Sequence, residues 1–326
     1  MAIKQFYLNL KQCLESETFT KILLSKGDIN SDSRRLFLVK CLYFLISTRD
    51  FVNFDKFINR YYKGIFPHEY LKEKENLSDK QTENIIYNNF IRNGFLFHIT
   101  PSNNIEEILT KGLLTLNDKY KCDLYKKSLE LNETYSQIRN RNKSLNELFK
   151  MPNLINIPGL EEYHEDRFNT VYLSSNLDYI LKTYGNSGEL FSFFVRDLLW
   201  VFNNFDDVDT LTNKELKNKI IKIIKDSNAQ IYDKEINKIL DYIDTIYEDK
   251  KSDVNTKSIL LVPSNQITSN FTYFEPLYKN NSLNLPVETI LEFSEGEIGS
   301  SNSILPNNII AIYTNEDKSL SLKMKK

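Results

Sequence analysis

The chain has few glycines, cysteines and histidines, and each shortage argues against a class of protein. Nine glycines in 326 residues leave no G-x-G-x-x-G dinucleotide fingerprint, no G-x-x-x-x-G-K-[ST] phosphate loop and no G-x-S-x-G nucleophile elbow. The three cysteines, at positions 13, 41 and 122, have no spacing typical of a metal site or a disulfide framework, and their odd number favours a reducing compartment. The three histidines lie far apart and without cysteine pairs, so we expect no metal site.

Long apolar runs and a basic leader are also missing. The most apolar run, Leu36 to Ile46, contains Lys40 and is too short to span a bilayer. The start MAIKQFYLNLKQ has no basic region followed by an apolar core, so we expect no signal peptide, no membrane partner and a cytoplasmic chain. A net charge of -2 argues against binding a polyelectrolyte by bulk charge.

The stretch FLFHITPSNNIEEILTKGLL, residues 95–114, predicts a strand, a tight turn and a short helix. Apolar side chains alternate over 95–99 with the period of a half-buried strand, and Pro101 then breaks the pattern because it cannot donate to a ladder. His98 and Thr100 therefore leave the strand on one side, at the mouth of the turn.

The expected helix after this strand has both a start and a stop. Asn103 and Glu106 have the spacing of a capping box, and an acidic residue in a first turn suits the helix dipole. Ile105, Ile108 and Leu109 give a helical stripe, and Gly112 supplies a left-handed stop.

A second strand and helix are predicted in TVYLSSNLDYILKTY, residues 170–184. Apolar and polar residues alternate up to Ser174, and Ser175 or Asn176 then caps a helix. This pattern places Tyr172 on the strand and Tyr184 at the end of the helix.

A third candidate segment is EGEIGSSNSILPNNIIAIY, residues 295–313. Glu297 precedes an apolar residue and a Gly-Ser-rich turn, and an I-L-P sequence leads into an apolar strand at 309–313. Glu295 and Glu297 face one way on an extended segment. Glu288 and Glu292 are further candidates if the strand register differs.

These three segments resemble the motifs of the ADP-ribosyltransferase superfamily. The F-H-x-T strand with its I-L-x-x-G-L-L helix, the Y-L-S strand, and the Glu before I-x-P are similar to the His-Tyr-Glu type. Diphtheria-like toxins, poly-ADP-ribose polymerases and DNA-modifying bacterial transferases share this type. The resemblance implies that His98 holds the ribose next to nicotinamide and that Tyr172 stacks on the nicotinamide ring. It also implies that Glu297 bonds a ribose hydroxyl and steadies the developing positive charge.

The resemblance extends to neighbouring residues. Thr100 joins His98 among the expected NAD-binding residues, and Tyr184 could add a second aromatic wall. The E-x-E pair resembles the Arg-Ser-Glu branch, in which the first Glu, here Glu295, orients the acceptor. His98 occupies the place of the Arg in that branch, so Glu295 and Glu297 both stay candidates for the catalytic carboxylate.

The cluster Arg139-Asn140-Arg141-Asn142-Lys143 is the most basic part of the chain. Such a run is most often a solvated helix face. Its position between two motifs also suits a loop over an anionic ligand, where the planar fork of arginine bonds phosphate oxygens. On that second interpretation Arg139 and Arg141 hold the NAD diphosphate or a nucleic-acid backbone.

The predicted fold is α+β. We expect an N-terminal helical domain over residues 1–92 with its own core. A split antiparallel β-sheet core of ADP-ribosyltransferase type is expected over 93–326, with helical insertions at about 116–160 and 205–255. The expected strands lie at 95–99, 170–174, 189–195, 258–262, 270–274, 287–293 and 309–313.

The predicted function is NAD-dependent mono-ADP-ribosyl transfer. NAD is the co-substrate and no metal is implied. The acceptor is a protein, DNA or RNA, as in a bacterial toxin or a phage-defence effector, and an antitoxin or regulator could bind the N-terminal helices. A catalytically degenerate binding protein of the same fold and a tRNA 2′-phosphotransferase-like enzyme are the alternatives; the latter needs arginines around its phosphate.

Overall fold

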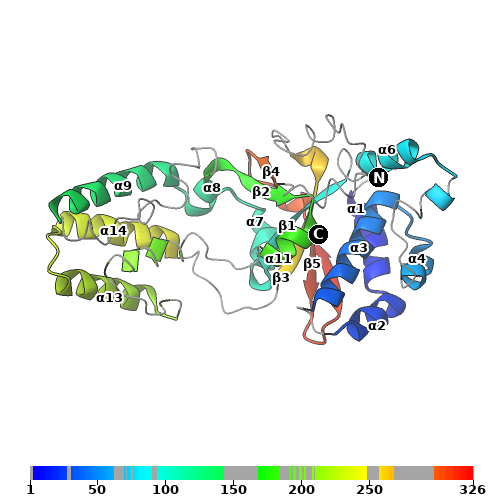
Figure 1. The fold of residues 1–326 in the computed structure, drawn as a ribbon, viewed down its shortest axis with the longest axis horizontal. Helices are drawn as coiled ribbons and strands as arrows, with labels where there is room; N and C mark the ends of the chain where they lie inside the picture. The colour runs from blue at the N-terminus through cyan, green and yellow to red at the C-terminus, as the bar shows by residue number, and fades with distance from the viewer. Residues whose placement is uncertain are drawn as a thin grey trace. The chain divides into compact units, whose positions relative to one another are not determined.

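The fold is an antiparallel sheet with helices on its two faces and a separate group of helices (Figure 1). The computed structural model describes residues 3–27, 31–61, 70, 72–74, 76–89, 94–142, 168–183, 191, 194–195, 198–199, 202, 208, 210–247, 257–267 and 297–325. The predicted α+β class is confirmed. None of the helices in these ranges has the length and apolar character needed to cross a membrane.

Six strands form the sheet, in the order β4-β2-β1-β3-β5-β6, and every neighbouring pair is antiparallel. Their bounds are β1 Phe95–Pro101, β2 Val171–Ser174, β3 Lys257–Pro263, β4 Glu297–Ser300, β5 Ile310–Thr314 and β6 Leu320–Met324. The strands predicted at 95–99, 170–174, 258–262 and 309–313 are confirmed within a residue or two. Those predicted at 270–274 and 287–293 lie outside the described residues.

Strand β1 forms many more residue pairs with β3 than with β2. Residues 95 to 101 of β1 all pair with β3, whereas a single pair, Phe97 with Ser174, joins β1 to β2. Strands β2 and β4 are in turn joined by four pairs. The described strands therefore lie in one sheet whose halves, β4-β2 and β1-β3-β5-β6, meet at one residue pair.

The N-terminal helices pack on one face of this sheet (Figure 1). Their bounds are α1 Ile3–Leu14, α2 Glu17–Ser25, α3 Asp32–Thr48, α4 Phe54–Tyr61 and α6 Asp79–Tyr87. Phe6 of α1 stacks on Phe95 of β1 with the ring centroids 4.3 Å apart, and both rings belong to one apolar cluster with Phe97 and Leu261. The prediction that these helices have their own core is therefore wrong, because their apolar stripes cover the sheet. The domain boundary between residues 92 and 93 stays a prediction.

The opposite face of the sheet carries a smaller apolar cluster under α7, Ile105–Lys111. Gly112 ends this helix with φ of 97°, as predicted, and an added β-carbon would lie 2.1 Å from the Ile304 carbonyl oxygen. The capping box predicted from Asn103 and Glu106 is wrong. Residues Ser102–Asn104 form a 3-10 turn, so the helix starts after Asn104 without a side-chain cap.

The predicted last strand, β5, is followed by a further strand, β6, at one edge of the sheet. Helix α1 contacts the outer side of that edge. The Tyr7 hydroxyl donates to the Leu322 carbonyl at 3.2 Å, and the Leu322 amide donates to the Glu15 carboxylate at 3.0 Å. Side chains therefore satisfy backbone groups that an edge strand would otherwise leave to solvent.

The second group of helices forms a compact unit by itself. It comprises Thr115–Asn169 and Asn186–Asp253, and the rest of the chain forms the sheet unit. Its described helices are α8 Leu116–Tyr120, α9 Leu124–Arg141, α13 Asn213–Asp226 and α14 Asp233–Ile246. The two predicted insertions thus contribute to one helical unit with one core.

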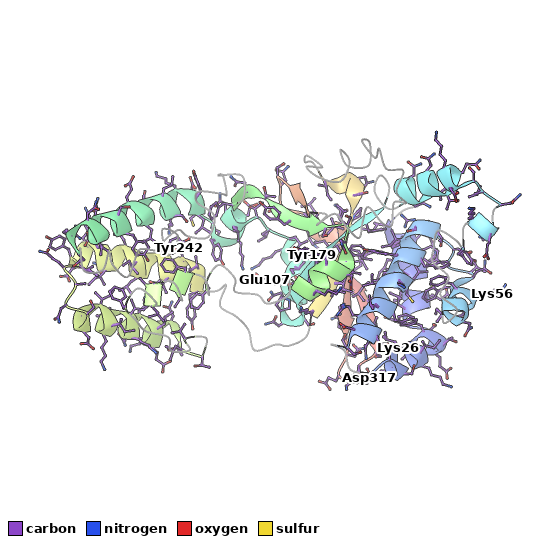
Figure 2. The ribbon with its side chains drawn as sticks, viewed as in Figure 1. Lys26, Lys56, Glu107, Tyr179, Tyr242 and Asp317 are labelled. Carbon is purple, nitrogen blue, oxygen red and sulfur yellow. The ribbon has the colours of Figure 1, made fainter. Side chains whose placement is uncertain are left out.

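The strand predicted at 189–195 is wrong. Phe191, Phe194 and Val195 are helical and buried in the core of the helical unit. A short continuous apolar run does not distinguish a buried strand from a buried helix segment. Tyr242 of α14, labelled in Figure 2, lies in the same core, and its hydroxyl is 3.0 Å from the Ser128 hydroxyl of α9.

Candidate functional site

The three motifs meet on three neighbouring strands. Phe97 of β1 pairs with Ser174 of β2, and Ser174 pairs in turn with Glu297 of β4. His98 is the residue after Phe97, and Tyr172 lies two residues before Ser174. Residues far apart in the sequence are therefore brought within a few residue positions of each other at the junction of the two half-sheets.

The His98 imidazole makes a hydrogen bond across this junction. Its Nδ1 lies 2.9 Å from the carbonyl oxygen of Tyr172. Because a carbonyl oxygen only accepts, Nδ1 carries the hydrogen, and in the neutral ring Nε2 is an acceptor. Burial lowers the pKa of His98 below its ordinary value of 6.5, against the opposing effect of the bond to Tyr172. His98 is therefore a neutral imidazole at neutral pH.

The Tyr172 side chain lies on the other face of the sheet from His98. Val171 and Leu173 belong to the same buried cluster as Leu96, whose face His98 shares, so the pleat turns Tyr172 away from them. The Tyr172 side chain is 40% exposed. A ligand that touches both rings would have to lie where β1 and β2 separate.

The residue opposite Tyr172 on β4 is Gly299. An added β-carbon at Gly299 would lie 2.7 Å from Cγ2 of Thr170, so a larger residue would require a local shift. A strand glycine leaves room for close approach of another group. From this register position β4 contributes no side chain that would cover the Tyr172 ring.

Thr100 shares the His98 side of β1, as predicted, and is buried. Its hydroxyl accepts from Nδ2 of Asn104 at 3.3 Å, and the hydroxyls of Ser102 and Ser258 lie 2.7 Å apart. Sequence reasoning did not identify Ser258 or Asn104 as neighbours of the first motif. Ser258 lies on β3, about 160 residues further along the chain, and becomes a neighbour of this motif because it pairs with Thr100 in the sheet.

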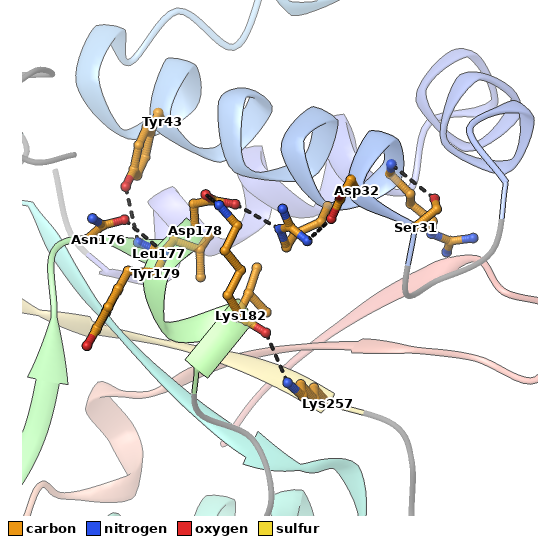
Figure 3. A network of polar contacts seen from close by, with 12 residues as sticks. Ser31, Asp32, Tyr43, Asn176, Leu177, Asp178, Tyr179, Lys182 and Lys257 are labelled. Atoms are coloured by element: carbon orange, nitrogen blue, oxygen red, sulfur yellow. Dashed lines mark hydrogen bonds and ion pairs between the residues drawn. The ribbon is translucent and has the colours of Figure 1, made fainter. Parts of the chain in front are cut away.

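The turn after β2 has the predicted form. Asn176 accepts from the Tyr179 amide at 3.0 Å through its side-chain oxygen, and α11 runs over Leu177–Thr183. Figure 3 shows this turn with the residues that contact it. Tyr184, predicted as a second aromatic wall, lies outside the described residues, as does Glu295.

The third motif is also tied directly to the first. The Leu113 amide donates to the Ile304 carbonyl at 3.0 Å, and the Ile304 amide donates back at 2.8 Å. Glu297 is placed by its backbone pairing with Ser174. The choice between Glu295 and Glu297 as the catalytic carboxylate stays open.

Arg141 of the predicted basic cluster is engaged inside the helical unit. Its Nη2 donates to both carboxylate oxygens of Glu235, and its guanidinium lies 4.5 Å from the centroid of the Tyr232 ring. Arg141 would have to release Glu235 to bond a phosphate through the same nitrogen. The Arg139 side chain and Lys143 lie outside the described structure, and phosphate binding by the cluster stays a prediction.

Comparisons of the chain with protein-family models, with curated proteins and with solved structures give no significant match. The resemblance to ADP-ribosyltransferases therefore depends on the three motifs and on where their residues lie in the sheet. His98 and Tyr172 each lie on a strand. Strands hold such side chains more rigidly than loops do.

Proposed function

We propose that the chain is an NAD-dependent mono-ADP-ribosyltransferase. The observation that supports this function best is the meeting of His98, Tyr172 and Glu297 on the neighbouring strands β1, β2 and β4. The family resemblance names one residue in each of three separate segments, and these segments form neighbouring strands.

The proposed reaction breaks the bond between ribose and nicotinamide. The electron pair of that bond leaves with nicotinamide, which becomes neutral, and an electron-poor anomeric carbon remains. A nucleophile of the acceptor then bonds to this carbon and loses its proton. A fixed carboxylate beside an oxocarbenium-like centre stabilises it most where water is excluded, as carboxylates do in glycosidases. Glu297 would supply this charge.

The two ring-bearing residues would bind NAD. The neutral His98 would accept a hydrogen bond from a ribose hydroxyl through Nε2, because Nδ1 is already bonded to the Tyr172 carbonyl. The exposed Tyr172 ring would stack on nicotinamide, since stacking needs an accessible aromatic face. Tyr172 is 40% exposed and His98 is half-buried, and their side chains leave the sheet on opposite faces, so NAD would have to reach both at the junction of β1 and β2.

We favour this function over that of a tRNA 2′-phosphotransferase-like enzyme. Such an enzyme needs arginines around a phosphate, and Arg141 is paired with Glu235. A degenerate fold that binds a partner without cleaving NAD differs from our proposal in one measurable outcome, nicotinamide release.

The test is to incubate the purified chain with NAD and measure released nicotinamide. We expect release by the native chain and a loss of turnover on the order of a hundredfold or more in Glu297→Gln, with NAD binding largely intact. Glu107→Gln is the matched control, since Glu107 is an exposed glutamate of the sheet unit paired with Lys111. No nicotinamide release by the native chain would refute the proposal. If Glu295→Gln abolished release and Glu297→Gln did not, Glu295 would be the catalytic carboxylate.

A further inference from the structure

Helix α3 holds the turn that connects β2 to α11. The Tyr43 hydroxyl donates to the Ser175 carbonyl at 3.1 Å. It also accepts from the Leu177 amide at 3.1 Å (Figure 3). The first amides of a helix have no partner within the helix, so an outside acceptor stabilises the helix start. One hydroxyl thus bonds the backbone on both sides of Asn176.

The same tyrosine lies at the weakest junction of the sheet. The Tyr43 ring is 6.1 Å from the ring of Phe97, centroid to centroid. Phe97 and Ser174 form the single pair between β1 and β2, and Ser175 is the next residue after that pair. Tyr43 therefore contacts both half-sheets at the point where few backbone bonds join them.

Arg35 of α3 and Lys257 of β3 hold α11 further, and Lys182 bonds Asp178 within the helix itself. Arg35 of α3 bonds Asp178 at 2.8 Å, and Lys182 bonds the same carboxylate at 2.5 Å. Burial acts to raise the pKa of Asp178, but the bonds from Lys182 and Arg35 outweigh it and hold the pKa below its ordinary value. At the other end of α11, Lys257 of β3 donates to the Leu181 carbonyl at 2.9 Å, where a cation suits the helix dipole.

We propose that Tyr43 is a positioning residue that holds the β2–α11 turn against β1 and so sets the Tyr172 carbonyl against His98. The inference rests on the proposed function for its effect on NAD, and it gives the N-terminal helices a part in the site. Without the hydroxyl, β2 keeps four pairs to β4 but has one pair and no Tyr43 hydrogen bonds to keep it beside β1. The His98 ring would then lose its fixed partner.

The test is Tyr43→Phe, which removes the hydroxyl and keeps the ring. We expect amide hydrogen exchange at Ser175–Leu177 to become about tenfold faster, as the loss of hydrogen bonds implies. The pKa of His98, followed by NMR, should fall further below its ordinary value, because the bond to the Tyr172 carbonyl raises it against the effect of burial. The KM for NAD should rise several-fold with a smaller change in kcat.

The matched control is Tyr7→Phe, which removes another tyrosine hydroxyl of the N-terminal helices, bonded to the Leu322 carbonyl. It should change none of these readouts. Unchanged exchange in Tyr43→Phe overturns the inference, and so does faster exchange with His98 and KM unaltered. If the native chain releases no nicotinamide, the proposed function fails, and amide exchange and the His98 titration decide: faster exchange with a lowered pKa supports the positioning role, and an unmoved pKa overturns it.

Discussion

His98 in the sheet unit and Arg141 in the helical unit are both ionisable candidate residues, and their surroundings differ. Arg141 bonds a buried carboxylate and lies on an aromatic ring, so its bonding capacity serves the packing of α9 against α14. Across the described ranges, His98 has one hydrogen bond, to a backbone carbonyl, and its Nε2 keeps an available lone pair. Arg141 therefore has donors engaged in packing, whereas Nε2 of His98 has no hydrogen bond among the described residues.

The largest expected effect is on the scaffold beneath His98. Leu260 pairs with His98 from β3 and is fully buried. We expect Leu260→Ala to lower the free energy of unfolding by about 2–5 kcal/mol, through lost burial and a residual cavity. Chemical denaturation measures this, with Leu305→Ala as the control because Leu305 is 68% exposed. If the two substitutions lowered the free energy of unfolding equally, the packing of β3 against β1 would not stabilise the sheet as we expect.

The next effect separates packing from ligand binding in the helical unit. Arg141→Gln leaves the buried Glu235 carboxylate without its cation and should destabilise the chain by roughly 1–3 kcal/mol. If Arg141 serves packing alone, the NAD binding constant should stay unchanged, which isothermal titration would show. Weaker NAD binding by a variant that is still folded would instead support phosphate binding by Arg141. Replacing Arg139, Arg141 and Lys143 together with Gln should then weaken NAD binding further.

A smaller effect tests the exposed ring of the sheet unit. Tyr172→Ala should weaken NAD binding by about two- to fifteen-fold, since an aromatic pair contributes about 0.5–1.5 kcal/mol. Tyr172→Phe keeps the ring and should bind NAD nearly as well as the native chain. If Phe and Ala weaken binding equally, the hydroxyl rather than the ring is what NAD contacts.

The smallest effect is the pH dependence due to His98. Its pKa is lowered in the folded chain, so between that value and about 6.5 the unfolded chain binds more protons. Stability should therefore fall as the pH falls below about 6.5, and stay level above it. His98→Gln should reduce the difference between unfolding free energies measured at pH 7.5 and pH 5.5. An undiminished difference would assign the pH dependence to other groups.

Local patterns in the sequence predicted the strands that carry the site. The strand at 95–99 and the turn at Ser175 and Asn176 were predicted correctly because side-chain period and helix capping act over a few residues. The expectation that this strand is half-buried was wrong, since both of its faces are covered. The capping box predicted at Asn103 does not form, because Asn103 lies inside a 3-10 turn and not at the residue before the helix. The run at 189–195 failed because a buried helix and a buried strand can have the same composition.

Pairing between distant strands could not be derived from the sequence pattern. Nothing in the spacing of His98, Tyr172 and Glu297 shows that β1, β2 and β4 are neighbours; only the family resemblance suggested that they meet. The shared core was missed for the same reason, because the stripe of α1 does not reveal that Phe6 stacks on Phe95. Side-chain bonds over long sequence distances, such as Tyr43 to Ser175, leave no local pattern at all.

The contact of α1 with β6 has a consequence for self-association. An uncovered edge strand can recruit a strand from another molecule, because its free amides and carbonyls are ready to pair. Here both backbone groups of Leu322 are already bonded, by Tyr7 and Glu15. Tyr7 of α1 and Glu15, just after it, therefore occupy the backbone groups of Leu322, and a chain without these side chains would leave that part of β6 open to pairing with a strand of another molecule.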